Sequence, residues 1–110
     1  MRKFQLGEFE ELVMLTVGIL DDGAYGVAIK SEIEKRLERR VSVGAMQSAL
    51  VRLEEKGFLS SKESSGGQER AGRPKKYFRL TGVGQEALEY TRSTRNELWS
   101  AIPSSALNKG

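Results

Sequence analysis

Apolar side chains recur every three or four positions along the first half of the chain, which is the spacing that places them on one face of an α-helix. The pattern predicts a first helix over residues 7–20, a turn at Asp21-Asp22-Gly23, and a second helix that begins near Gly26 and ends near Arg39-Arg40. A third helix follows Ser42, and its inward face contains Met46, Ala49, Leu50 and Leu53.

The third helix has polar or small residues at its ends and along its outer side. Ser42 can accept a hydrogen bond from an unpaired backbone amide in the first turn, and Gly57 suits the left-handed position that ends a helix. The outer side consists of Gly44, Ala45, Gln47, Ser48, Val51, Arg52 and Glu55.

The second half of the chain predicts a two-stranded hairpin followed by one long helix. Phe58-Leu59 begins a strand, and residues 76–80 return as its partner. Thr81 is placed to cap a helix that Pro103 ends. The residues after Pro103 are expected to form a frayed tail.

This order of elements defines the expected fold class, which is mainly α with a small β-hairpin. Three helices followed by a hairpin is the order of a winged helix-turn-helix, which we expect over residues 1–80. Residues 81–103 would then form a C-terminal dimerisation helix, and residues 104–110 a flexible tail. The apolar stripe of this helix can be covered by the same stripe of a second copy, through Leu88, Leu98, Trp99 and Ile102.

Positive charge is concentrated in the hairpin. Six basic and two acidic residues lie between positions 60 and 80, a net charge of +4, whereas the whole chain carries +3. Such a focused patch is typical of a nucleic-acid binder, although a solvated loop that keeps a protein soluble can have the same composition.

The residue inventory argues against an enzyme. The chain has neither cysteine nor histidine, so the commonest general base, the thiol nucleophile and the usual metal ligands are missing together. We expect no catalytic residue, no metal and no cofactor. The longest apolar run, residues 12–20, is too short to cross a membrane, and acidic residues follow the N-terminus too soon for a signal peptide. We therefore expect a cytoplasmic protein.

The outer side of the third helix suits it to the major groove of DNA, which is wide enough for one helix. Gly44 and Ala45 would let the start of the helix approach phosphates, which its amides and dipole favour. Gln47 can pair with adenine or be an ordinary solvated residue. Ser42 can act as a cap, a contact or both, and Tyr77 can donate to a phosphate or shield the core.

Three blocks of the sequence point to a known family when they are taken together in this order. They are YGVAI at residues 25–29, VSVGAMQSALVRLEEKGFL at residues 41–59 and GRPKKYFRLT at residues 72–81. The chain resembles the PadR family of bacterial transcriptional regulators over about residues 6–87. The resemblance implies a winged-helix repressor that dimerises through its C-terminal helix and binds a pseudo-palindromic operator in double-stranded DNA.

The chain also departs from the family pattern. The family often has Pro, Thr and Tyr where this chain has Val43, Ala45 and Gln47, which implies a different operator sequence. The single C-terminal helix resembles a compact branch of the family, some of whose members bind flat hydrophobic drugs between the subunits. A small hydrophobic effector is therefore a further expected partner, and Trp99 would line either its pocket or the dimer interface.

We therefore predict a sequence-specific DNA-binding transcriptional regulator that acts as a repressor and binds as a homodimer. The alternative is a winged-helix module that binds another protein. Such a module would have an apolar or mixed hairpin, and it would not explain why the hairpin is basic. The residues expected to contact DNA are Tyr25, Ser42, Gly44, Ala45, Gln47, Ser48, Arg52, Arg70, Gly72, Arg73, Lys75, Lys76 and Tyr77.

Overall fold

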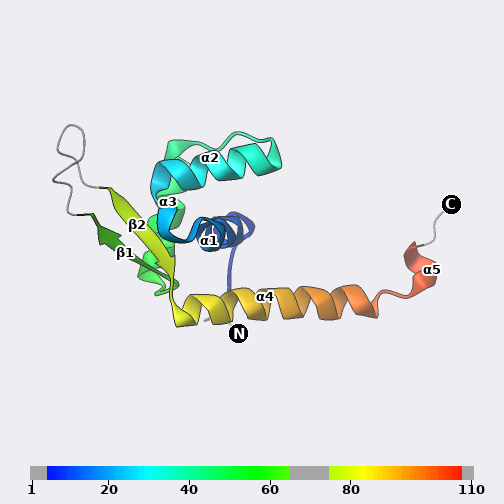
Figure 1. Ribbon diagram of the computed structural model, residues 1–110. Helices are drawn as coiled ribbons and strands as arrows, with labels where there is room; N and C mark the ends of the chain where they lie inside the picture. Colours follow the sequence, from blue (N-terminus) through cyan, green and yellow to red (C-terminus); the bar gives the residue numbers. More distant parts are fainter. Residues whose placement is uncertain (1–4, 65–74, 108–110) are drawn as a thin grey trace.

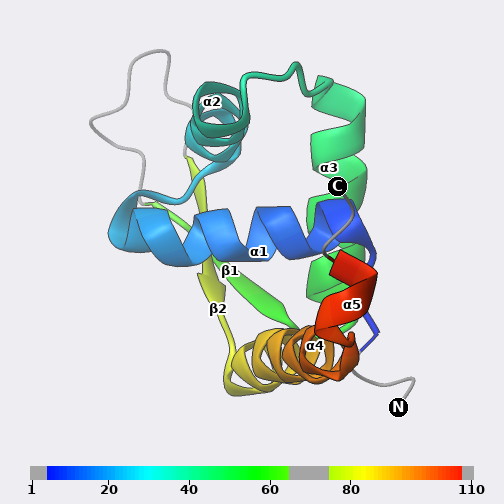
Figure 2. The ribbon, with the colours of Figure 1, turned by 90° about the vertical axis from the view of Figure 1, so that its right-hand side faces the viewer.

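The computed structural model describes residues 5–64 and 75–107 of the chain. Its elements are α1 (Glu8–Leu20), the short 3-10 helix η2 (Asp21–Gly23), α2 (Gly26–Leu37), α3 (Val43–Glu55), β1 (Leu59–Glu63), β2 (Lys76–Leu80), α4 (Gly82–Ala101) and α5 (Ser104–Leu107). The first three helices pack together, the hairpin of β1 and β2 lies beside them, and α4 crosses α1 (Figures 1 and 2). The predicted winged helix-turn-helix with one long C-terminal helix is confirmed.

The hydrophobic core lies between α1, α2, α3 and the inner side of the hairpin. All four residues predicted to face inward from α3 are buried, as the helical spacing required. The largest fully buried side chains come from four elements and one linker, and are Phe58, Met14, Ile29, Ile33, Met46, Leu53, Leu59, Val13 and Val17.

The first turns of α4 pack directly on this core. Gly84 and Ala87 are buried, and a Cβ added to Gly84 would lie 2.1 Å from the carbonyl oxygen of Phe58. Only glycine allows the helix to approach the chain this closely. The second half of α4 extends away from the other helices (Figure 1), which gives the chain a length of 60 Å against widths of 30 and 22 Å.

Both predicted N-terminal caps are confirmed. Ser42 Oγ accepts a hydrogen bond from the Ala45 amide at 3.0 Å, and Thr81 Oγ1 accepts one from the Gly84 amide at 2.9 Å. Thr81 Oγ1 also donates to the carbonyl of Gly57 at 2.6 Å, so this side chain joins the end of α3 to the start of α4. Gly57 has the expected positive φ of 80°.

The expected end of the second helix was wrong. Helix α2 ends at Leu37 and not near Arg39-Arg40, because Glu38 adopts the left-handed conformation and Glu34 accepts a hydrogen bond from the Val41 amide at 2.9 Å. After Pro103 the chain forms the short helix α5, in which the carbonyl of Pro103 accepts a hydrogen bond from the Ala106 amide at 2.9 Å.

The hairpin is antiparallel, and its register pairs Leu59 with Leu80 and Glu63 with Lys76. Strand β2 is also attached to the start of α2. The Phe78 amide donates to the carbonyl of Ala24 at 2.8 Å, and Tyr25 forms an isolated β-bridge with Tyr77. These contacts fix the position of β2 relative to the helices.

None of the helices in residues 5–64 and 75–107 is both long and apolar enough to cross a membrane.

Candidate nucleic-acid interface

Helix α3 presents an exposed face beside its buried one. Ser42, Gly44, Ala45, Gln47, Ser48 and Val51 are all exposed, whereas Met46, Ala49 and Leu50 between them are buried. The exposed side chains are short at the start of the helix, so another molecule can come close to the backbone there. The dipole of the helix makes this end attractive to anions.

A hollow of about 430 Å³ opens between α3 and β2. Four residues predicted to contact DNA line it together, namely Tyr25, Gln47, Lys75 and Lys76. The side-chain amide of Gln47 lies close to Gly26, the first residue of α2. A Cβ added to Gly26 would be 3.8 Å from Gln47 Nε2. The fold thus brings Gln47 and the two lysines to the lining of one hollow.

Lys75, Tyr25 and Tyr77 form a cluster at the loop end of the hairpin. Lys75 Nζ lies 4.4 Å from the centre of the Tyr25 ring, which is a cation–π contact. The rings of Tyr25 and Tyr77 meet edge to face with their centres 5.4 Å apart. Tyr77 is half-buried, while its neighbour Phe78 is buried in the core.

Lys76 and Glu54 form an ion pair across the hollow, with 3.5 Å between Lys76 Nζ and Glu54 Oε1. Ser61 Oγ donates a hydrogen bond to the other carboxylate oxygen of Glu54. The sequence analysis missed Glu54 because its partners lie in the hairpin. It also missed Val27, an exposed apolar residue of α2 that lines the same hollow.

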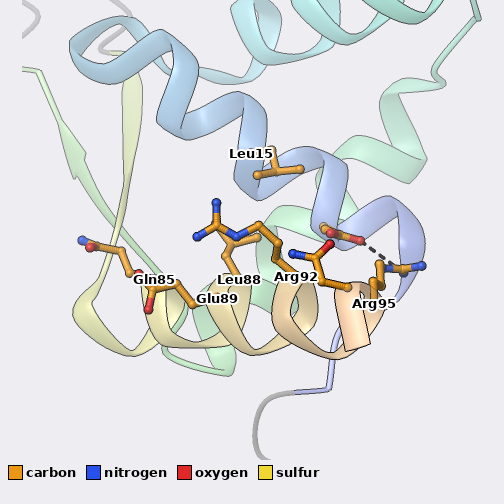
Figure 3. A pocket seen from close by; sticks show the side chains of 8 residues that line it. Leu15, Gln85, Leu88, Glu89, Arg92 and Arg95 are labelled. Atoms are coloured by element: carbon orange, nitrogen blue, oxygen red, sulfur yellow. Dashed lines mark hydrogen bonds and ion pairs between the residues drawn. The ribbon is translucent and has the colours of Figure 1, made fainter. Parts of the chain in front are cut away.

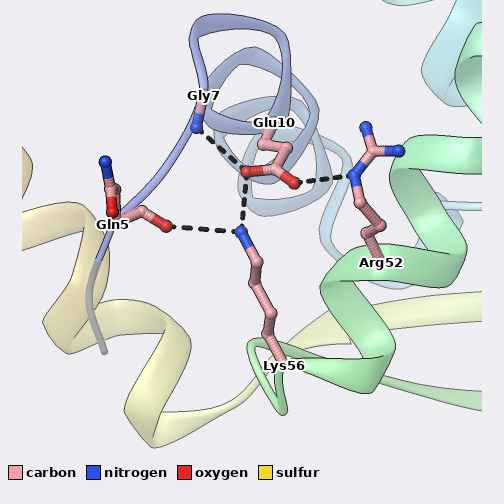
Figure 4. Close-up of polar contacts among 5 residues, drawn as sticks. All are labelled: Gln5, Gly7, Glu10, Arg52 and Lys56. Atoms are coloured by element: carbon pink, nitrogen blue, oxygen red, sulfur yellow. Dashed lines mark hydrogen bonds and ion pairs between the residues drawn. The ribbon is translucent and has the colours of Figure 1, made fainter. Parts of the chain in front are cut away.

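Arg52 lies at the other end of α3, where it contacts α1. Arg52 Nε donates to Glu10 Oε2 at 3.1 Å, and Lys56 Nζ donates to Glu10 Oε1 at 3.0 Å (Figure 4). Glu10 was also missed, although the sequence contains a signal: it is a charged residue on the buried face of α1, at helical spacing from Val13 and Val17.

The environment of Glu10 favours its charged form. Burial alone raises the pKa of this carboxyl group, but hydrogen bonds from the Gly7 amide, Lys56 and Arg52 outweigh burial and lower its pKa. The pKa of Glu34 is lowered by the hydrogen bond from the Val41 amide and by Lys30. The carboxylate of Glu10, which contacts the C-terminal end of α3, is therefore ionised at neutral pH.

Three predicted contacts, Arg70, Gly72 and Arg73, lie outside the described residues.

The residues predicted for dimerisation fall into two groups on α4. Leu88 is half-buried and lines a groove of about 400 Å³ between α1 and α4, together with Leu15, Arg92 and Arg95 (Figure 3). Farther along the helix Leu98 and Trp99 are both 66% exposed. Ile102, at the end of α4, is partly covered.

The fold and this arrangement of an exposed helix, a basic hairpin and a protruding helix define a winged-helix protein. Residues 16–90 match the model of the family described as "Transcriptional regulator PadR-like family". The match covers more than half of the chain, which therefore belongs to the PadR-like family, a family of transcriptional regulators and not of enzymes. A comparison with curated proteins found no significant match.

Solved structures of similar fold include several regulators of this family. A PadR-like transcription factor from Bacteroides fragilis has 29% identity and a TM-score of 0.72, over 90% of this chain and 87% of that one. A PadR family regulator from Eggerthella lenta has 25% identity and a TM-score of 0.70, over 94% and 88%. PadR of Bacillus subtilis, solved in complex with operator DNA, has 20% identity and a TM-score of 0.61, over 77% and 46%. This last similarity concerns the fold alone.

Proposed function

We propose that this protein binds double-stranded DNA in a sequence-specific manner as a homodimer and represses transcription at a pseudo-palindromic operator. The observation that supports this most directly is the hollow between α3 and β2. It places a hydrogen-bonding side chain of an exposed helix, Gln47, beside two lysines of a basic hairpin, Lys75 and Lys76. Contacts to base edges read the sequence and contacts to phosphates position the protein on the duplex, so a sequence-specific surface uses both kinds of group.

In this proposal α3 enters the major groove with its N-terminal half. Gln47 would pair with a base edge, and the exposed methyl groups of Val51 would suit contact with a thymine methyl group. Ser42, Gly44, Ala45 and Ser48 would lie near the backbone at the entry point of the helix. The hairpin would follow the neighbouring groove.

The contacts that Lys75 and Lys76 make within the chain support a role in binding phosphates. Lys75 lies over the ring of Tyr25, and Lys76 pairs with Glu54 through a half-exposed side chain. Both interactions are of a kind that contributes little free energy at a surface, so phosphate groups can replace them. In the protein without DNA, the same contacts hold both lysines on the lining of the hollow.

The second half of α4 supports a two-fold dimer. Leu98 and Trp99 are exposed on a helix that leaves the rest of the domain (Figure 1). A symmetric partner would cover this surface with an identical one. The two recognition helices of the dimer would then contact half-sites that are about one helical turn of DNA apart, or a multiple of it. Repression would follow because a bound dimer blocks the DNA that it covers.

Enrichment of DNA from a random pool tests the proposal. The purified protein should enrich a duplex with two related half-sites, footprinting should show both on one face, and sedimentation at micromolar concentration should give twice the chain mass. Failure to enrich any sequence, with no protection of DNA, would favour a protein-binding module. A monomer that still reads one half-site would remove the dimer from the proposal.

We further propose that the groove between α1 and α4 accepts a small hydrophobic effector. Leu15 and Leu88 provide apolar surface there, and Arg92 and Arg95 border it (Figure 3). Titration with flat aromatic dyes should change the fluorescence of the dye and the affinity of the protein for the enriched duplex together. A dye that binds without changing DNA affinity would not be an effector.

A further inference from the structure

Glu10 is a buried charged residue that links α1 to the C-terminal half of α3. Its side chain is only 8% exposed, and its two carboxylate oxygens accept hydrogen bonds from two cations, Arg52 of α3 and Lys56 at the C-cap of this helix. A third hydrogen bond comes from the Gly7 amide at 2.9 Å, and Lys56 Nζ also lies 3.3 Å from the carbonyl of Gln5 (Figure 4). Both carboxylate oxygens of Glu10 therefore accept hydrogen bonds, and these bonds fix the orientation of the carboxylate.

The remaining contacts between α1 and α3 are of a different kind. The buried residues of the two helices, such as Val13, Met14 and Leu53, meet through apolar surfaces. Apolar packing is not directional, and it tolerates small rotations and shifts better than a hydrogen bond does. The two hydrogen bonds that Glu10 accepts from Arg52 and Lys56 therefore restrict the rotation of α3 and its sliding along α1.

The position of this link along α3 matters for the other end of the helix. Arg52 is nine residues after Val43, a distance of roughly 14 Å at 1.5 Å per residue. A small change of helix direction at Arg52 moves Gln47 and the N-terminal turn relative to the hairpin. The link also orients Arg52 itself, because Nε is held by Glu10 while the two terminal nitrogens lie on the side away from it (Figure 4).

We propose that Glu10 is a positioning residue of the DNA-reading surface, which acts through Arg52 and Lys56 to set the direction of α3 and thereby the discrimination between DNA sequences. This inference rests on the proposed DNA binding. Glu10 itself stays buried and touches no DNA. Its role is distinct from a general contribution to stability, which would affect all DNA sequences alike.

The test compares Glu10→Gln with the matched control Glu8→Gln, which removes the same charge from an exposed position of the same helical turn. Affinity is measured for the duplex that the wild-type protein enriches from a random pool and for a scrambled duplex of the same composition. Circular dichroism establishes that each variant is fully folded at the temperature of the measurement. The selectivity is the ratio of the two affinities.

We expect the selectivity of Glu10→Gln to fall by roughly tenfold, the value of about one well-placed base contact. Its affinity for the scrambled duplex should hold or rise, because two cations lose their partner carboxylate and can turn to phosphates. The selectivity of Glu8→Gln should equal that of the wild type. Equal losses on both duplexes, or an unchanged selectivity of folded Glu10→Gln, would overturn the proposal.

Arg52→Lys provides a second variant in case Glu10→Gln does not fold. The Arg52 side chain is 54% exposed, so lysine fits, and the charge is kept while the bond from Nε is lost. Selectivity should fall, because the affinity for the enriched duplex should decrease more than the affinity for the scrambled duplex. A variant with wild-type selectivity would refute the inference and leave the DNA-binding proposal intact, whereas a wild-type protein that enriches no duplex would refute both.

Discussion

The α3–hairpin surface and the far half of α4 are both exposed, but their side chains are held in different ways. At the α3–hairpin surface, which lines the hollow between α3 and β2, the chain supplies its own partners, since Lys75 lies on Tyr25 and Lys76 pairs with Glu54. In the far half of α4, Leu98 and Trp99 extend into solvent. The first surface is prepared within one chain, whereas the second gains from a partner that covers it. Binding DNA and forming the dimer should therefore be separable by mutation.

The largest effect should come from replacing Leu98 and Trp99 together by Ala. If these residues are the centre of a dimer interface, their loss should weaken dimerisation by about 4 kcal/mol, because a central aromatic and its apolar neighbour each contribute on the order of 2 kcal/mol. Sedimentation across a concentration series measures the shift. Thermal unfolding of the monomer should change little, and a double variant that remains a dimer at low micromolar concentration would exclude this face.

Gly84→Ala tests where the packed domain ends and the protruding helix begins. The new methyl group would meet the carbonyl oxygen of Phe58, so we expect a loss of about 3 kcal/mol in the free energy of unfolding. Gly82→Ala is the matched control, because a Cβ there has nothing within 4 Å. Denaturant unfolding should show a change within about 1 kcal/mol for the control. Equal stability of the two variants would contradict the close approach of α4 to Phe58.

Gln47→Ala tests base reading at the α3–hairpin surface. We expect a loss of about 2 kcal/mol on the enriched duplex and little change on a scrambled one, as for a side chain that contacts a base edge. The neighbouring exposed residue Ser48 offers a control through Ser48→Ala, whose expected backbone contact should weaken both duplexes alike. A loss for Gln47→Ala that is equal on both duplexes would assign Gln47 to general affinity.

Lys75→Ala and Lys76→Ala should each weaken binding in a way that depends on salt. Each lost phosphate contact reduces the magnitude of the slope of log affinity against log salt by about 0.9. Because a dimer loses one contact in each subunit, the slope should change by about 2. Lys35→Ala removes the same charge from the end of α2, away from the hollow, and should keep the wild-type slope. If all three variants have the same slope, Lys75 and Lys76 at the loop end of the hairpin do not contact phosphates.

The sequence predicted the fold to a large extent because local signals coincide with the element boundaries. Ser42 and Thr81 mark helix starts, Gly57 marks a helix end, and the apolar spacing of α3 identifies its buried face. The end of α2 was missed because the left-handed conformation of Glu38 is rare for a residue with a side chain.

The contacts of the candidate site could be predicted only in part. The sequence placed Gln47 on the outer side of α3 and the lysines in the hairpin, but it could not show that they share one hollow. Glu54 meets Lys76, and Glu10 meets Arg52, only after the chain has folded. Pairs that are 22 and 42 positions apart leave no periodic pattern in a single sequence.

The smallest expected effect is the pH dependence of the link between α1 and α3. Because the pKa of Glu10 is lowered in the folded chain, the stabilisation from its charged form is fully present above the pKa of the unfolded chain and is lost as pH falls through the folded value. The groups that face Glu10 are Arg52 of α3 and Lys56, the residue that follows this helix. The difference in unfolding free energy between the wild type and Glu10→Gln should therefore be constant around pH 7 and shrink towards acidic pH. Denaturant unfolding from pH 7 to pH 3 measures it, with Glu8→Gln as the control for exposed charge. A difference that does not depend on pH would mean that the charge of Glu10 is not what holds α3, and that the shape of its side chain is sufficient.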